Sequence, residues 1–174
     1  MRLFCIWLAL LVSLSGSAKC VRITGSRKGN RGASMNDKMS TLFHQLECED
    51  GLHRCIIEDN GRVAYAYLVK GNTTVGDLWL YNQAESPIEP EWRDRTKMPF
   101  LNPVSFVDSV SMAQPLKTSD DLAVVWELDQ DGIVTKAKLF LFGQLYGVLA
   151  PLAKPGWCIA ALKDGPLAKT LNID

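Results

Sequence analysis

The residues of this chain that are best suited to chemistry are five cysteines and two histidines, His44 and His53. Histidine is the general base that titrates near neutral pH, and cysteine can act as a nucleophile, a metal ligand or a disulfide partner. A Ser-His-Asp site also needs a positioned serine, and the GxSxG elbow that would supply one does not occur in the sequence. The sequence therefore favours a protein that is not an enzyme.

Metal and cofactor motifs are also missing from the sequence. No CxxC pair occurs, and a zinc site needs several cysteines and histidines at convergent spacings. Residues 129–132 (DQDG) have the composition of part of a calcium loop, but the acidic residue that closes such a loop does not follow. Residues 25–32 contain glycines without the GKS/T ending of a phosphate-binding loop. We predict no cofactor and no metal.

The first eighteen residues have the layout of a secretory signal peptide. Arg2 precedes an apolar run over residues 3–12, and small side chains follow up to Ala18. A membrane-spanning helix would need about 20 apolar residues, which is longer than this run. We predict cleavage after Ala18, removal of Cys5 with residues 1–18, and a periplasmic or secreted location.

Four cysteines remain after cleavage, an even number in an oxidising compartment, which predicts two disulfide bonds. Three pairings are consistent with this number. We favour Cys48–Cys55, because a short turn that contains a glycine separates the two residues. Cys20–Cys158 would then join the start of the domain to a late strand.

Charge and length indicate the class of partner. Lysine plus arginine and aspartate plus glutamate number 19 each, which gives a formal net charge of zero and argues against a nucleic acid partner. Residues 19–174 fit one globular domain. No apolar run after the leader approaches the length of a membrane span, so we predict none after signal cleavage.

Periodicity predicts one helix near the start of this domain. Met39, Leu42, Phe43 and Leu46 follow the i, i+3, i+4, i+7 spacing of an amphipathic helix, which we place over residues 36–47.

Alternating patterns and turn residues predict strands along the rest of the chain. Asp59-Asn60-Gly61 predicts a hairpin between strands, and residues 78–81 predict a third strand after a turn at residues 70–72. Asn72 begins an N-glycosylation sequon that applies only if the source is eukaryotic.

A second hairpin is predicted further along the chain, where strand 122–128 turns through residues 129–132 into strand 133–142. We also predict a closing strand over 157–162 and a short helix over 167–171. The predicted fold class is α+β, mostly β: a single disulfide-stapled domain whose antiparallel sheet has about seven strands, with one N-terminal amphipathic helix.

Residues 82–103 interrupt these patterns with four prolines, which makes regular structure improbable across them. Long irregular segments in compact domains are often functional. Trp92 stands beside Arg93 and near Arg95, and exposed tryptophan with arginine is typical of a protein-binding hot spot. The alternative is a lid in which Trp92 and Phe100 close an edge of the core.

These observations favour a small exported protein-binding module whose partner is another protein. The most plausible form is an inhibitor or a periplasmic immunity protein that occludes the active site of a toxin or secreted enzyme. Either Trp92 with the two arginines or residues 109–112 would project from the sheet and occlude the partner's cleft. The predicted partner-binding residues are Trp92, Arg93, Arg95, Ser109, Ser111 and Met112.

Two other functions stay open. A small-molecule or lipid carrier would use a group of apolar residues around an internal cavity. A secreted hydrolase, which the sequence favours less, would need His44 or His53 beside a nucleophile in a cleft. The carrier residues would be Phe140, Phe142, Leu145, Tyr146 and Val148.

Overall fold

Four consecutive strands form one antiparallel sheet in a simple meander. The computed structural model describes residues 19–20 and 41–172, and the predicted signal peptide (1–18) lies outside them. Short turns connect each strand to the next, and the spatial order is the order in the sequence. The strands are β2 (Leu42–Glu47), β3 (His53–Asp59), β4 (Val63–Lys70) and β5 (Thr73–Asn82).

The later part of the chain forms a second sheet. Its order is β1-β6-β7-β8-β9-β10, and all neighbours are antiparallel except β9 and β10, which are parallel. The strands are β1 (Lys19–Cys20), β6 (Leu122–Leu128), β7 (Val134–Leu141), β8 (Gln144–Leu149), β9 (Trp157–Cys158) and β10 (Lys169–Thr170).

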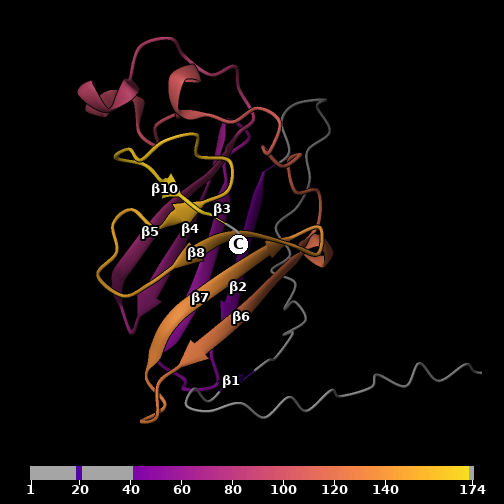
Figure 1. Ribbon diagram of the computed structural model, residues 1–174, viewed down its shortest axis with the longest axis vertical. Helices are drawn as coiled ribbons and strands as arrows, with labels where there is room; N and C mark the ends of the chain where they lie inside the picture. Colours follow the sequence, from indigo (N-terminus) through magenta and orange to yellow (C-terminus); the bar gives the residue numbers. More distant parts are fainter. Residues whose placement is uncertain (1–18, 21–40, 173–174) are drawn as a thin grey trace, which may run out of the picture.

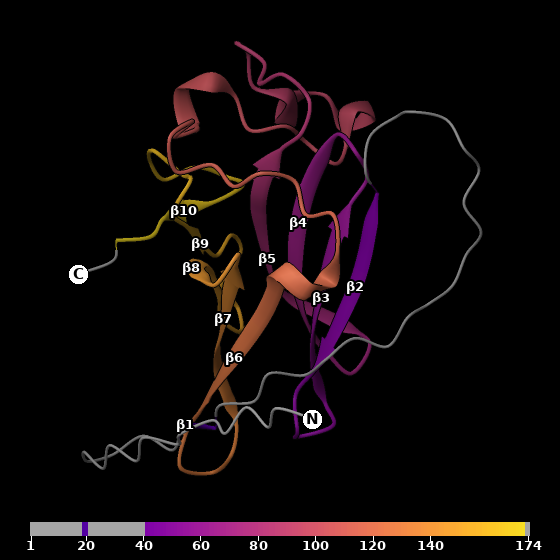
Figure 2. The same cartoon turned by 90° about the vertical axis from the view of Figure 1, so that its right-hand side faces the viewer.

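The two sheets face each other and enclose the core as a β-sandwich (Figures 1 and 2). They approach most closely where β8 crosses β5. A Cβ atom on Gly147 would lie only 2.7 Å from Cδ2 of Leu78, so any larger residue there would force the Leu78 side chain to shift. The Tyr146 hydroxyl donates a hydrogen bond to the Leu80 carbonyl at 3.0 Å, which joins the sheets by a polar contact as well.

The predicted N-terminal helix is wrong, because residues 42–47 form strand β2. Residues 36–40 of that prediction lie outside the described residues. Leu42 and Leu46 fit both the spacing of a helix and the alternation of a strand. The side chains that β2 buries are His44 and Leu46, which follow the strand alternation. No helix of seven or more residues occurs in the described part of the chain. The protein is mostly β with two sheets, and the predicted single seven-stranded sheet is also wrong.

The disulfide prediction is contradicted as well. Cys48, Cys55 and Cys158 are buried free thiols. Across the β2–β3 ladder, Cys55 stands directly opposite Leu46. Cys48 is therefore only a diagonal neighbour of Cys55 and does not face it. The Cα positions of Cys20 and Cys158 lie on β1 and β9, four strands apart, which corresponds to about 19 Å. A disulfide bond allows a Cα separation of at most about 7 Å.

The turn chemistry of both hairpins is confirmed. Asp59 and Val63 flank the first turn between β3 and β4, and Gly61 has a φ of 82°. Residues 129–133 turn β6 into β7, where Gly132 has a φ of 77°. Both values lie in the left-handed region that glycine adopts without strain.

The C-terminal predictions are only partly correct. A strand begins at Trp157, but it ends at Cys158 instead of residue 162. The predicted helix over 167–171 is wrong, because Lys169 and Thr170 form β10. Asn72 is exposed in the β4–β5 turn, and its glycosylation stays a prediction.

A search of the described residues for helices long and apolar enough to cross a membrane finds none.

Candidate functional site

Residues 83–121 connect β5 to β6 and cover one end of the sandwich (Figure 1). We call this segment the crown. It extends beyond the predicted insertion at residues 82–103. The crown contains four short 3₁₀ turns, η1 (Glu91–Arg93), η2 (Arg95–Lys97), η3 (Val104–Phe106) and η4 (Ser119–Asp121).

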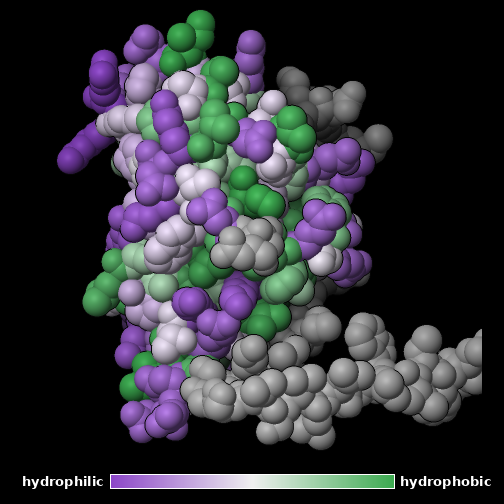
Figure 3. Space-filling view, viewed as in Figure 1, coloured by the Kyte–Doolittle hydropathy of each residue, from purple (hydrophilic) through white to green (hydrophobic). Residues whose placement is uncertain are grey.

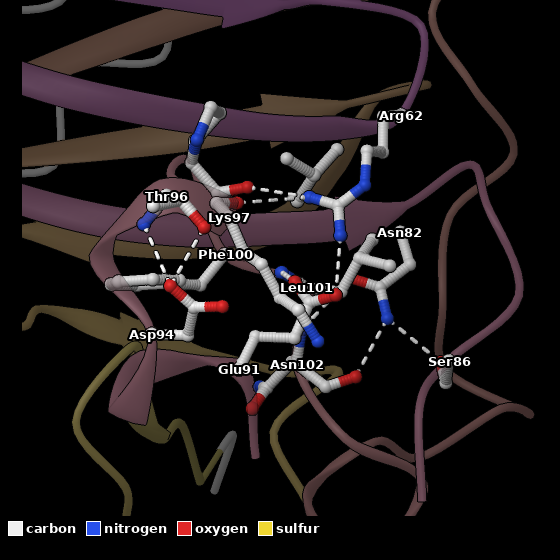
Figure 4. A network of polar contacts seen from close by, with 12 residues as sticks. Arg62, Asn82, Ser86, Glu91, Asp94, Thr96, Lys97, Phe100, Leu101 and Asn102 are labelled. Atoms are coloured by element: carbon white, nitrogen blue, oxygen red, sulfur yellow. Dashed lines mark hydrogen bonds and ion pairs between the residues drawn. The ribbon is translucent and has the colours of Figure 1, made fainter. Parts of the chain in front are cut away.

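A buried carboxylate anchors the crown to the first sheet (Figure 4). Glu91 is 7% exposed, and its Oε1 forms an ion pair with Nη2 of Arg62, which lies in the β3–β4 turn. Its Oε2 accepts a hydrogen bond from the backbone N–H of Leu101 at 2.8 Å. Arg62 also donates to the carbonyl of Pro99 at 2.8 Å. One ion pair thus ties two distant parts of the crown to the sheet.

Asn82, the last residue of β5, forms a second anchor (Figure 4). Its Nδ2 donates to the Asn102 carbonyl at 2.7 Å, and its Oδ1 accepts from the Asn102 N–H at 3.1 Å. The indole N–H of Trp79 donates to the same Oδ1 at 2.8 Å. Both asparagines are buried, and these hydrogen bonds satisfy the Asn82 amide and the Asn102 backbone inside the protein, as buried polar groups require.

Tyrosine hydroxyls hold further points of the crown. Tyr65 donates to the carbonyl of Phe100 at 2.7 Å. The hydroxyl of Tyr146 accepts from the N–H of Ala113 at 3.0 Å. Burial raises the pKa of both hydroxyls, which keeps them protonated at physiological pH. The hydroxyl of Tyr81 likewise accepts a hydrogen bond from the backbone N–H of Leu116 at 3.0 Å.

Trp92 packs within the crown, which favours the alternative interpretation of this residue. Its ring meets the ring of Phe106 edge to face, with centroids 5.5 Å apart. The ammonium of Lys163, which lies in the connection between β9 and β10, is 4.2 Å from the centroid of the Phe106 ring. Trp92 is half-buried and belongs to the hydrophobic layer packed against the core, as does Phe100.

The crown also exposes large apolar side chains. Ile88 is 84% exposed and Val104 is 56% exposed. The N–H of Val104 donates to the carbonyl of Pro87, the residue before Ile88, at 2.9 Å, so the backbones of Ile88 and Val104 are close. The N–H of Leu162, another exposed residue, donates to the carbonyl of Phe106 at 3.0 Å. Figure 3 shows hydrophobic groups among hydrophilic ones at this end of the molecule.

Val110 stands at the tip of a turn that Asp108 fixes. Oδ1 of Asp108 accepts from the Val110 N–H at 3.0 Å, and Oδ2 accepts from the Ser111 hydroxyl at 2.7 Å. The Ser111 and Val110 hydrogen bonds lower the pKa of Asp108, so the carboxylate stays ionised and the turn stays bonded at neutral pH. The Val110 side chain is 92% exposed.

The structure places the predicted partner-binding residues in different environments. Arg93, Arg95 and Ser109 are exposed on the crown, and Ser111 shapes the turn below Val110. Met112, like Trp92, packs against the core. Sequence reasoning did not select Ile88 or Val104, because no local pattern distinguishes an exposed apolar residue from a buried one. Whether any of these residues binds a partner stays a prediction.

The two histidines lie on the buried face of the first sheet. His53 Nδ1 is 2.5 Å from Oδ2 of Asp50 in the β2–β3 turn. Burial alone would raise the pKa of Asp50, but hydrogen bonds from His53 and Leu52 outweigh it and lower the pKa. Burial lowers the pKa of His44, which favours its neutral form.

The cysteine thiols are buried in the same core. Desolvation raises the pKa of Cys48 and of Cys55, and it raises the pKa of Cys158 to about 12. These groups are therefore thiols at neutral pH, and a thiol is a weaker nucleophile and metal ligand than a thiolate. In the part of the chain that the structure describes, no three His, Cys, Asp or Glu residues could hold a metal ion.

The residues suggested for a carrier are spread over different surroundings. Tyr146 and Val148 are buried, and the Tyr146 hydroxyl joins the sheets. Phe142 is 47% exposed at the β7–β8 turn. Phe140 and Leu145 are half-buried cross-strand neighbours.

No family model, curated protein or solved structure matches this chain.

Proposed function

We propose that this protein is a small exported protein-binding module and that the crown is the surface that contacts its partner. The observation that carries the proposal is Val110, which is 92% exposed at the tip of a turn that Asp108 fixes. Isolated exposed apolar residues are ordinary. Here Ile88 and Val104 are exposed on the same segment, and several large apolar side chains exposed on one segment favour a protein contact.

The buried anchors of the crown support this proposal through entropy. Loops that become ordered on binding lose conformational freedom, and that loss weakens the complex. Glu91 and Asn82 hold the crown by hydrogen bonds and an ion pair within the protein itself. A segment fixed before it meets its partner loses less entropy on association.

The form of this function that we propose is inhibition. A fixed turn with an apolar tip can enter the cleft of an enzyme or toxin and exclude its substrate. Arg93, Arg95 and Ser109 are exposed on the same segment and would form the polar rim that surrounds an apolar centre. A periplasmic immunity protein would act on a toxin in this way, and a secreted inhibitor on an enzyme.

Affinity capture with matched variants tests the proposal. The purified chain and its Val110→Asp variant would be immobilised and exposed to the extracytoplasmic fraction of the source organism. We expect one protein to be retained by the original chain and at least tenfold less by Val110→Asp, because a buried charge at a contact centre costs more than about 1.4 kcal/mol. Addition of the chain should then suppress the activity of the retained protein.

Leu152→Asp is the matched control. Leu152 is 90% exposed, but its N–H donates to the carbonyl of Val75, which lies seven residues before the end of β5, or about 23 Å along that strand. Leu152→Asp should retain the partner as the original chain does. Equal retention by Val110→Asp and the original chain would contradict the assignment of the crown, and retention without inhibition would contradict the inhibitor.

A further inference from the structure

The outer edge of β2 is a regular strand edge with which no described strand pairs. β2 is the first strand of its sheet and pairs with β3 alone in the part of the chain that the structure describes. The opposite edge, β5, is closed by the second half of the chain. There Val75 and Asp77 accept hydrogen bonds from Leu152 and Gly156, and the Trp79 N–H donates to Leu167.

The register shows which backbone groups of β2 point outward. The N–H of Cys48 donates to the carbonyl of His53 at 2.9 Å, so this is a hydrogen-bonded pair of the β2–β3 ladder. Such pairs alternate along an antiparallel ladder, and the register has no shift. The N–H and C=O groups of Phe43, Gln45 and Glu47 therefore point away from β3. Among the described residues, none forms a hydrogen bond with these groups.

Exposed strand edges in soluble proteins usually carry features that prevent pairing with another chain, such as lysine, proline or a bulge. The sequence of β2, LFHQLE, has no lysine or proline, and its register is continuous. The side chain of Phe43 is 68% exposed beside this edge. The strand is thus a suitable template for an added strand.

We propose that β2 pairs with β2 of a second copy of this chain, in an antiparallel arrangement about a two-fold axis at Gln45. This register places Phe43 opposite the partner's Glu47, and Gln45 opposite the partner's Gln45. All outward N–H and C=O groups are then bonded, which gives about six intermolecular hydrogen bonds and one continuous eight-stranded sheet.

Self-complementary side chains favour a second copy as the occupant. On the buried face, this register places His44 opposite the partner's Leu46, and burial lowers the pKa of His44 so that its ring is neutral. On the exposed face, the carboxylate of Glu47 meets an aromatic ring instead of another carboxylate. No like charges stand directly opposite each other, a pairing that would be destabilising. A shift of one residue would place buried side chains opposite exposed ones.

Cysteine cross-linking tests the axis directly. Only a residue on the two-fold axis faces itself, so Gln45→Cys should form an intermolecular disulfide under mild oxidation, with Cα atoms about 5.5 Å apart. Glu47→Cys is the matched control: it lies on the same exposed face, but the two copies of this residue would be about 13 Å apart. Equal cross-linking of Gln45→Cys and Glu47→Cys, or none of Gln45→Cys, would overturn the proposal.

Sedimentation equilibrium tests the association itself. The original chain should show a monomer–dimer equilibrium with a dissociation constant on the order of 10–100 µM, as suits a small interface. Phe43→Glu should weaken it at least tenfold, because it places a carboxylate directly opposite the partner's Glu47, whereas Phe142→Glu, the same change at an exposed residue outside β2, should not. A purely monomeric original chain, or a Phe43→Glu variant that dimerises unchanged, would overturn the proposal.

Discussion

Glu91→Ala is expected to lower the free energy of unfolding by about 2–4 kcal/mol. The substitution removes the ion pair with Arg62 and leaves the N–H of Leu101, a 4% exposed residue, without its acceptor. The Arg62 side chain is 31% exposed, so water compensates part of the loss at that partner and the value stays below that of a fully buried pair. Denaturant unfolding followed by circular dichroism would measure the change.

Glu89→Ala is the matched control for this measurement. Glu89 is an exposed carboxylate two residues earlier on the crown, and its removal should change stability by less than about 0.5 kcal/mol. Glu91→Gln should be intermediate, because an amide oxygen can still accept from Leu101. If Glu91→Ala and Glu89→Ala had the same stability, the crown would not depend on the buried carboxylate.

Trp92→Ala is expected to lower the free energy of unfolding by about 2 kcal/mol, since a half-buried indole loses part of the 3–5 kcal/mol typical of a buried one. The loss arises from the edge-to-face contact with Phe106 and from packing against the core. The neighbouring variant Arg93→Ala should be nearly neutral, because Arg93 is exposed. Thermal and denaturant unfolding of both variants would separate the two roles.

The opposite result would restore the hot-spot interpretation of Trp92. If Trp92→Ala left stability unchanged, the indole would not be part of the core, and a role in partner binding would account for it better. This variant therefore separates the two interpretations that the sequence leaves open.

The hairpins were predictable because their signals are local. Asp59-Asn60-Gly61 and the turn at residues 129–132 each place a glycine where the chain needs a positive φ. Strand 122–128 was predictable in the same way, from a continuous run of strand-forming residues bounded by acidic turns. Each of these predictions depends on a few consecutive residues.

The N-terminal helix was mispredicted because one polar residue hides the alternating pattern. The buried face of β2 and the next residue consists of His44, Leu46 and Cys48, and a histidine in that position resembles a polar residue of a helix. Leu42 and Leu46 then fit the helical spacing by chance. The pairing of β2 with β3 decides the conformation, and tertiary pairing overrides a local pattern of this kind.

The order of the crown could not be predicted, because its contacts join residues far apart in the sequence. Arg62 meets Glu91 after 29 residues, and Tyr65 reaches Phe100 after 35. Four prolines and many charges indicate an irregular segment, and the segment is irregular. Neither signal shows that buried side chains of the sheets hold it in place.

Amide hydrogen exchange of the crown tests the central claim, that this long connection is a fixed surface. The amides of Leu101, Val104 and Leu116 donate to acceptors inside the protein and should exchange at rates close to those of β4. Protection at these three positions is the result we predict. Exchange at the rate of an unstructured chain throughout residues 83–121 would contradict the account.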